Sequence, residues 1–142
     1  MALPESETGA RLKKVRELLE QEDLAAVLIY YDELNTANGW YLSGWCPQFE
    51  SGCIFVPRHG EPMILGGPES EPFAKIDSSI RETRNIPVFM VPGEEYPNAR
   101  ISSLAEIFCE VGLKGKGERI GVVGLERMPL GSTGSLRGTC EK

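Results

Sequence analysis

One uninterrupted apolar run, Leu24–Tyr31 (LAAVLIYY), constrains the fold of this 142-residue chain more than any other feature. Its length and its β-branched residues favour a strand, and the lack of polar alternation predicts burial on both faces. The segment just before it, Glu7–Gln21, has the spacing of an amphipathic helix. A helix that leads directly into such a strand predicts an α/β architecture with helices packed on a sheet.

The rest of the chain supplies the remaining layers of this architecture. A β-hairpin is predicted from strands at 52–56 and 62–65, because Pro57 to Gly60 is a tight-turn sequence. Helices are expected at 70–80 and 98–111, and further strands at 86–91 and 119–123. The sequence therefore predicts a three-layer α/β/α fold with a mixed sheet of about five strands.

Composition narrows the class of partner. Fifteen Lys and Arg against 21 Asp and Glu give a net charge of −6, which argues against a surface for nucleic acid or anionic membranes. No apolar run is long enough to cross a membrane, and the N-terminus lacks the apolar core of a signal peptide. We expect a cytoplasmic protein that binds neither nucleic acid nor membrane.

The inventory of reactive side chains is small. The single histidine, His59, falls in the predicted hairpin turn and is interpreted as a solvated turn residue. The four cysteines form no CxxC pair, which excludes a zinc knuckle, and we expect free thiols, buried at Cys53 and Cys109. Asp32 and Glu33 follow the buried strand, either as acid–base carboxylates or as a cap of the next turn.

Two further patterns were weighed as binding sites. Gly115 to Gly117 precede a strand instead of joining a strand to a helix, so they predict a plain turn and no phosphate loop. Trp40, Tyr41, Trp45 and Phe49 bring both tryptophans and two more rings into ten residues. This aromatic segment fits either core packing or a recognition surface, since Trp and Tyr are enriched at interfaces.

The order of these elements resembles a known domain. The segment Asn38-Gly-Trp-Tyr-Leu-Ser-Gly-Trp45 follows the buried strand, and a Gly-turn hairpin, a helix, a strand, a helix and Arg119-Ile-Gly-Val follow in turn. This succession is similar to the N-terminal domain of the creatinase/prolidase family, which includes Xaa-Pro dipeptidase, aminopeptidase P and creatinase. The likeness runs from about residue 10 to 131, so we expect a domain at 1–130 and a linker or truncated tail at 131–142.

The resemblance implies a ribonuclease H-like fold without catalytic residues or metal ligands of its own. A C-terminal catalytic domain of the same polypeptide would hold the dinuclear site for Mn, Co or Zn and hydrolyse the peptide substrate. The N-terminal domain would support a homodimer and reach over the partner subunit's active site. By this resemblance Trp45, Gln48 and Phe49 are candidates for substrate gating, whereas Asn38, Tyr41 and Gly44 shape the loop.

Two other readings stay open from the sequence. In the first interpretation, the chain would be a free-standing binding module that uses the aromatic loop 40–50 to hold a peptide or small molecule. Alternatively, it is the N-terminal domain of a creatinase-like hydrolase that acts on a small C–N substrate without metal. The sequence does not separate these readings from the peptidase interpretation.

Overall fold

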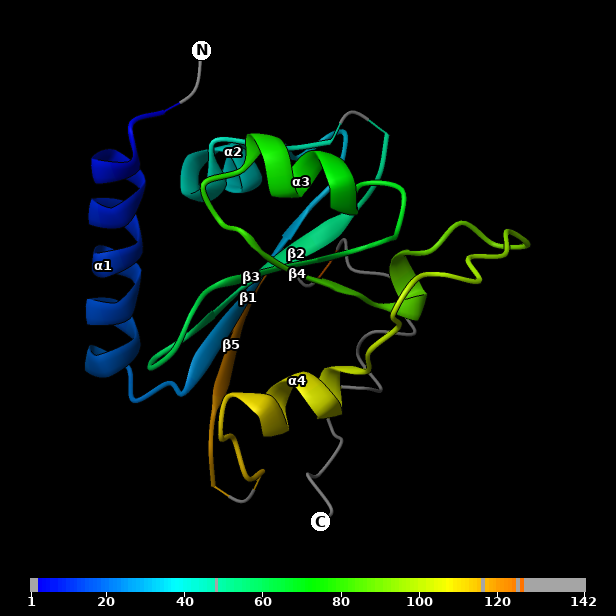
Figure 1. Ribbon diagram of the computed structural model, residues 1–142. Coiled ribbons are helices and arrows are strands. Elements are labelled where there is room, and N and C mark those ends of the chain that lie inside the picture. Colours follow the sequence, from blue (N-terminus) through cyan, green and yellow to red (C-terminus); the bar gives the residue numbers. More distant parts are fainter. Residues whose placement is uncertain (1–2, 48, 116, 125, 127–142) are drawn as a thin grey trace.

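The computed structural model describes residues 3–47, 49–115, 117–124 and 126, which form one sheet with helices on both faces (Figure 1). The strands are β1 (Ala26–Tyr31), β2 (Gly52–Pro57), β3 (Met63–Gly66), β4 (Glu82–Asn85) and β5 (Ile120–Val123). The helices are α1 (Glu5–Gln21), α2 (Ala37–Ser43), α3 (Glu71–Asp77) and α4 (Leu104–Glu110), with a short 3-10 helix, η1 (Pro87–Phe89).

The sheet has the strand order β4-β3-β2-β1-β5. β2 pairs antiparallel with both β1 and β3, whereas β5 runs parallel to β1 and β4 runs parallel to β3. The mixed five-stranded sheet and the hairpin of β2 and β3 confirm the predictions from the sequence. β1 lies between two neighbours, which is why its backbone polar groups are satisfied even though every residue is buried.

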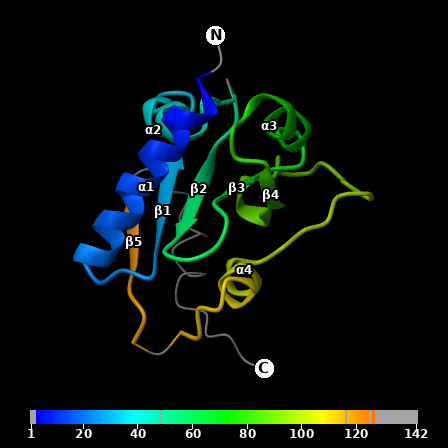
Figure 2. The ribbon, with the colours of Figure 1, turned by 60° about the vertical axis from the view of Figure 1, so that its left-hand side comes forward.

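Two apolar cores cover the two faces of the sheet, and β1 shows how the chain divides between them. Ala26, Leu28 and Tyr30 face the core that contains the apolar residues of α4. The alternate residues of β1 face a second core, to which α1, α2 and α3 contribute. Both views place α4 apart from the other three helices (Figures 1 and 2). The continuous apolar run therefore reflects burial on both faces.

The predicted strand at 86–91 is wrong. Pro87 to Phe89 form the 3-10 helix η1, and the strand that pairs with β3 is the polar segment Glu82–Asn85 immediately before it. Proline has no N–H group to donate to a ladder, so it ends the strand. The neighbouring Ile86 still donates its N–H to the Gly66 carbonyl at 2.9 Å, which continues the direction of β4 for one residue.

The predicted helices at 70–80 and 98–111 are also shorter in the structure. α4 begins only at Leu104, because Ser103 and Glu106 form a capping box. The Ser103 N–H donates to the Glu106 carboxylate at 2.6 Å, and the Glu106 N–H donates to the Ser103 hydroxyl at 3.2 Å. This reciprocal pair satisfies two donors that would otherwise be free at the first turn, and it fixes where the helix starts.

The carboxylate of Glu71 fastens α3 to the edge of the sheet. It accepts hydrogen bonds from Thr83 and Asn85, both at 2.8 Å, and lies 2.7 Å from the Lys75 ammonium. Burial raises the pKa of Glu71, but the hydrogen bonds from Lys75, Asn85 and Thr83 outweigh it, so the pKa is lowered. α3 is thereby held in place beside the candidate site described below.

The cysteines differ from one another. Cys53 is a buried free thiol in β2, and burial raises its pKa to about 12. Cys109 is half-buried and disulfide-bonded, so the prediction of a buried free thiol is wrong for this residue. Cys46 is free and half-buried.

Candidate functional site

The candidate site starts where α2 ends. Gly44 takes a left-handed conformation (φ 69°) and donates its N–H to the Trp40 carbonyl, which terminates the helix. The Ser43 hydroxyl, buried at this corner, lies 2.7 Å from the Gly39 carbonyl oxygen and 2.8 Å from that of Trp45. These contacts reverse the chain and fix the position of Trp45 at the start of the aromatic loop.

The three residues predicted to shape the loop all belong to this corner. Asn38 is half-buried in the first turn of α2, and Gly44 ends the helix. Tyr41 is exposed, with the Arg11 guanidinium 4.3 Å from its ring centroid, and its carbonyl accepts a hydrogen bond of 2.7 Å from Arg11. Tyr41 therefore joins α2 to α1, and the loop-shaping role of the three residues stays a prediction.

An aromatic cavity of about 500 Å³ lies between the loop and α3. Trp45 and Phe49 line it from the loop, and Phe73 lines it from the helix. Phe49 is 85% exposed and Phe73 is 61% exposed, whereas Trp45 packs partly against the core. Two of the three predicted gating residues are thus brought together; the third, Gln48, lies outside the described residues. We refer to this space as the aromatic cavity.

The titratable side chains among the described lining residues of the aromatic cavity are Cys46, Glu50 and Asp77. Glu50 lines both this cavity and a neighbouring one of about 200 Å³, and its pKa is raised by burial and by the nearby Glu69. Burial, reinforced by the charge of Asp32, raises the pKa of the Cys46 thiol to about 11. A thiol with this pKa is protonated at neutral pH and is a poor nucleophile. Cys46 is therefore not an activated nucleophile in this structure.

Asp32 acts as a cap in the structure. Its carboxylate accepts the N–H of Leu34 at 2.9 Å, and its carbonyl accepts the N–H of Asn35 at 3.0 Å. Such an Asx turn is a common structural use of aspartate after a strand. Of the two alternatives from the sequence, this geometry favours the cap over the acid–base role. Its neighbour Glu33 is exposed.

Two backbone amides just before Gly117 are already engaged in the structure. The Glu118 carboxylate accepts the N–H groups of Lys114 and Gly115 at 2.6 and 3.2 Å. A carboxylate of the chain itself therefore occupies two of the backbone donors of this segment. His59 is exposed beside the hairpin turn, as expected for a solvated residue.

Sequence reasoning missed two residues of the aromatic cavity, Phe73 and Asp77. Both lie on α3, where Phe73 and Ile76 stand three residues apart and read as the inward face of a helix. In the structure Ala74 is buried instead, and Ile76 is 72% exposed. Neither Pro72 in the first turn nor Lys75 indicates from the sequence that the larger side chains of α3 face outward.

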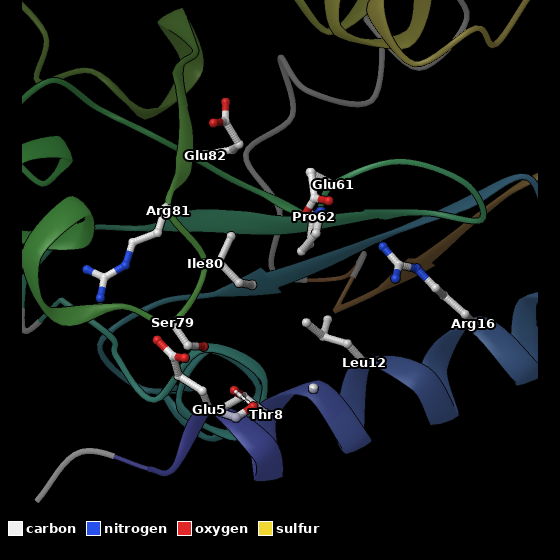
Figure 3. Close-up of a pocket in the computed structure, with 11 residues that line it drawn as sticks. Glu5, Thr8, Leu12, Arg16, Glu61, Pro62, Ser79, Ile80, Arg81 and Glu82 are labelled. Carbon is white, nitrogen blue, oxygen red and sulfur yellow. Dashed lines mark hydrogen bonds between the residues drawn. The ribbon is translucent and has the colours of Figure 1, made fainter.

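A second large cavity, of about 520 Å³, lies between α1, the β2–β3 turn and the segment 79–82 (Figure 3). Its two arginines each donate to backbone carbonyls, although the Nε of Arg16 is buried without a hydrogen-bond partner. Arg16 donates to the Gly60 carbonyl, and Arg81 donates to the Lys75 and Ile76 carbonyls at 2.6 and 2.8 Å. None of the site residues predicted from the sequence lines this second cavity, and its described lining residues include no histidine or cysteine.

A metal centre is not built by this part of the chain. In residues 3–47, 49–115, 117–124 and 126, no three His, Cys, Asp or Glu side chains come together to hold an ion. The dinuclear centre that the resemblance implies for a longer parent has no matching cluster of ligands among these described residues. Within the same residues, no helix is long and apolar enough to cross a membrane.

Comparison with known proteins identifies the fold. No family model matches the sequence, and no curated protein is similar to it in sequence. The structure is similar to dipeptidase PepE from Mycobacterium ulcerans, with a TM-score of 0.64 and 17% identity over 96% of this chain and 34% of that one. It is also similar to the prolidase from Pyrococcus horikoshii, with a TM-score of 0.59 and 18% identity over 92% of this chain and 30% of that one.

Other similar structures are separate N-terminal domains. A creatinase/prolidase N-terminal domain of an X-Pro dipeptidase from Streptococcus pyogenes has a TM-score of 0.60 and 16% identity, over 90% of this chain and 86% of that one. A creatinase/prolidase-like N-terminal domain from Corynebacterium diphtheriae has a TM-score of 0.60 and 10% identity, over 95% and 90%. The chain spans about a third of the two enzymes named first. It therefore has the fold of the creatinase/prolidase N-terminal domain.

Proposed function

We propose that this chain is the non-catalytic N-terminal domain of a prolidase-like peptidase and contributes to dimerisation and substrate gating there. The parent would hydrolyse Xaa-Pro or similar peptides in a separate C-terminal domain that carries a dinuclear Mn, Co or Zn site. The proposal draws on the fold and on the length of the similar enzymes, of which the chain spans about a third.

The observation that carries the gating role is the exposure of large apolar side chains around one cavity. Phe49 and Phe73 line the aromatic cavity and are mostly exposed, and Ile76 lies one turn further along α3. Large apolar side chains that gather on a surface mark sites where a partner or ligand is bound. Burying one of them fully stabilises a contact by about 1.5–3 kcal/mol, so their exposure in this chain favours an interface.

The direct test uses the natural gene product. We expect its intact mass in the source cells to be two to three times that of this 15.6 kDa chain. The full-length protein should cleave Xaa-Pro dipeptides when Mn²⁺ is added, and Trp45→Ala should change its activity while the fold is retained. A parent that cleaves no Xaa-Pro substrate with any divalent metal would refute the peptidase reading and favour a metal-independent, creatinase-like parent.

The aromatic cavity also favours one alternative, a binding module that works without a catalytic domain. Its volume of about 500 Å³ falls within the range of small-molecule sites, and its walls are mainly apolar and aromatic. If the natural gene product has the same mass as this chain, that result would support the binding module and would refute the proposed peptidase domain.

A further inference from the structure

The aromatic cavity is lined by aromatic rings and by carboxylates, and its described charges are all negative. Three rings, those of Trp45, Phe49 and Phe73, line it together with two carboxylates, Glu50 and Asp77. No lysine or arginine is among its described lining residues. The described lining therefore favours a ligand that carries a positive charge.

The negative charge at Glu50 is not neutralised by the surrounding protein. Within the described residues, no ion pair or hydrogen bond to its carboxylate is formed, and the nearby Glu69 adds a second negative charge. Both carboxylate oxygens of Glu69 are buried without a hydrogen-bond partner. A desolvated carboxylate without a donor is unfavourable, and a cationic ligand beside Glu50 would offset its repulsion from Glu69.

A third unpaired group lies in the same part of the sheet. Tyr31, the last residue of β1, is 1% exposed, and its hydroxyl has no hydrogen-bond partner. It interacts electrostatically with both Glu50 and Cys46, which line the aromatic cavity. The surroundings of Glu50 and Cys46 therefore include an unpartnered hydroxyl and the unpartnered carboxylate of Glu69, neither of which lines the cavity itself.

Aromatic faces and carboxylates together select an organic cation over a bare metal ion. A guanidinium or ammonium is attracted to the negative face of a ring within about 6 Å, and its methylene stem gains from apolar walls. A metal ion gains nothing from the rings, and two carboxylates leave most of its coordination positions unfilled.

We propose that the aromatic cavity binds the side chain of an arginine or lysine in a peptide, with Glu50 as its counter-ion and the three rings around its stem. This inference rests on the proposed function, because it names the class of peptide that the gate would admit: one with a basic residue at the position that meets the cavity.

Tryptophan fluorescence of the isolated chain tests the proposal. The chain has two tryptophans, so Trp40→Phe leaves Trp45 as the reporter inside the cavity. This protein is titrated with Arg-Pro and with citrulline-Pro, which has nearly the same shape but no side-chain charge. We expect Arg-Pro to shift the Trp45 emission and to bind at least 10-fold more tightly than citrulline-Pro.

Charge-removing variants locate the counter-ion. Glu50→Gln, introduced beside Trp40→Phe, should weaken Arg-Pro at least 10-fold and abolish the preference over citrulline-Pro. Glu61→Gln is the matched control, because it removes an exposed carboxylate that lines the other large cavity, and it should leave both affinities unchanged. Circular dichroism checks that each variant is folded.

The outcomes separate this proposal from the function on which it rests. Equal affinity for Arg-Pro and citrulline-Pro, no binding of either, or unchanged binding in Glu50→Gln overturns the basic-residue site. The gating role is judged independently, by the effect of Trp45→Ala on the full-length protein. A gate that operates without a basic preference would refute only the inference, whereas Arg-Pro binding with no effect of Trp45→Ala would refute only the gate.

Discussion

Replacing Phe49 by alanine separates an interface role from a folding role. Full burial of a phenylalanine stabilises by about 1.5–3 kcal/mol relative to exposure. Phe49 is 85% exposed, so the isolated chain gains almost none of this energy. We expect Phe49→Ala to change the free energy of unfolding by less than about 0.5 kcal/mol, as for other surface substitutions, when measured by urea denaturation of the isolated chain.

The same substitution should act strongly in a full-length dimer. If Phe49 becomes buried against a partner subunit, Phe49→Ala removes about 1.5–3 kcal/mol from each contact that contains it. Since 1.4 kcal/mol is a factor of ten, the dissociation constant of the dimer should rise by roughly 10- to 150-fold per contact. Sedimentation equilibrium over a dilution series measures this constant directly.

A buried phenylalanine provides the control. Phe55 is fully buried in β2, with its ring centroid 5.7 Å from that of Phe108. Phe55→Ala should cost about 3–5 kcal/mol of stability in the isolated chain, because it leaves a cavity in the core. The reasoning fails if Phe49→Ala destabilises the isolated chain to a similar degree. It fails equally if Phe49→Ala leaves the dimer constant and the substrate kinetics of the parent unchanged.

Three further predictions concern the isolated chain. Gly52→Ala should lower the free energy of unfolding, measured in urea, by about 1–3 kcal/mol, because a Cβ there would lie 2.6 Å from two oxygen atoms. Gly9 has open space around it, so Gly9→Ala should raise the free energy of unfolding by about 0.5–1 kcal/mol. Equal effects of the two substitutions would refute the packing argument. The lowered pKa of Glu71 stabilises the fold above its unfolded pKa of about 4.3, so urea midpoints should fall as the pH drops through the lower folded pKa, and less steeply in Glu71→Gln. With thiol pKa values of about 11 and about 12, Cys46 and Cys53 should resist alkylation at pH 7, with Cys46 modified before Cys53 in mass spectra; rapid labelling of Cys53 would contradict its burial.

The elements that could be predicted from the sequence are those decided by neighbouring residues. The run Leu24–Tyr31 has no polar face, so only a position inside the sheet can satisfy it, and β1 lies there with every residue buried. The turn between β2 and β3 contains Gly60 with φ 109°, a conformation that glycine adopts without strain. In both cases the information lies within a few residues of the element.

The elements that were missed are decided by distant contacts. β4 has the sequence Glu-Thr-Arg-Asn, which has little apolar character, while the apolar segment after it forms η1. Pairing with β3 and the hydrogen bonds from Thr83 and Asn85 to Glu71 determine this edge. The start of α4 could have been predicted from local sequence, because Ser103 and Glu106 have the spacing of a capping box.

Only the loop side of the aromatic cavity could be predicted, because the other side depends on a distant contact. The density of rings from Trp40 to Phe49 pointed to the loop, and Trp45 and Phe49 do line a cavity. The opposite wall, Phe73, comes from a helix about 25 residues later, and nothing in the local pattern of the loop names it. Only the packing of α3 against the sheet brings the two walls together.

The orientation of α3 bears on the proposed contact with another domain or subunit. A helix with Phe73 and Ile76 three residues apart would normally turn that face inward, yet the small Ala74 is buried and both larger side chains are exposed. The Glu71 carboxylate, held by Thr83 and Asn85, fixes this orientation, so the helix cannot rotate its apolar face into the core without losing those bonds. The periodicity of a helix records burial in the complete assembly. The exposed face of Phe73 and Ile76 is therefore the surface that the proposed contact with another domain or subunit would cover, and Phe73 also lines the aromatic cavity.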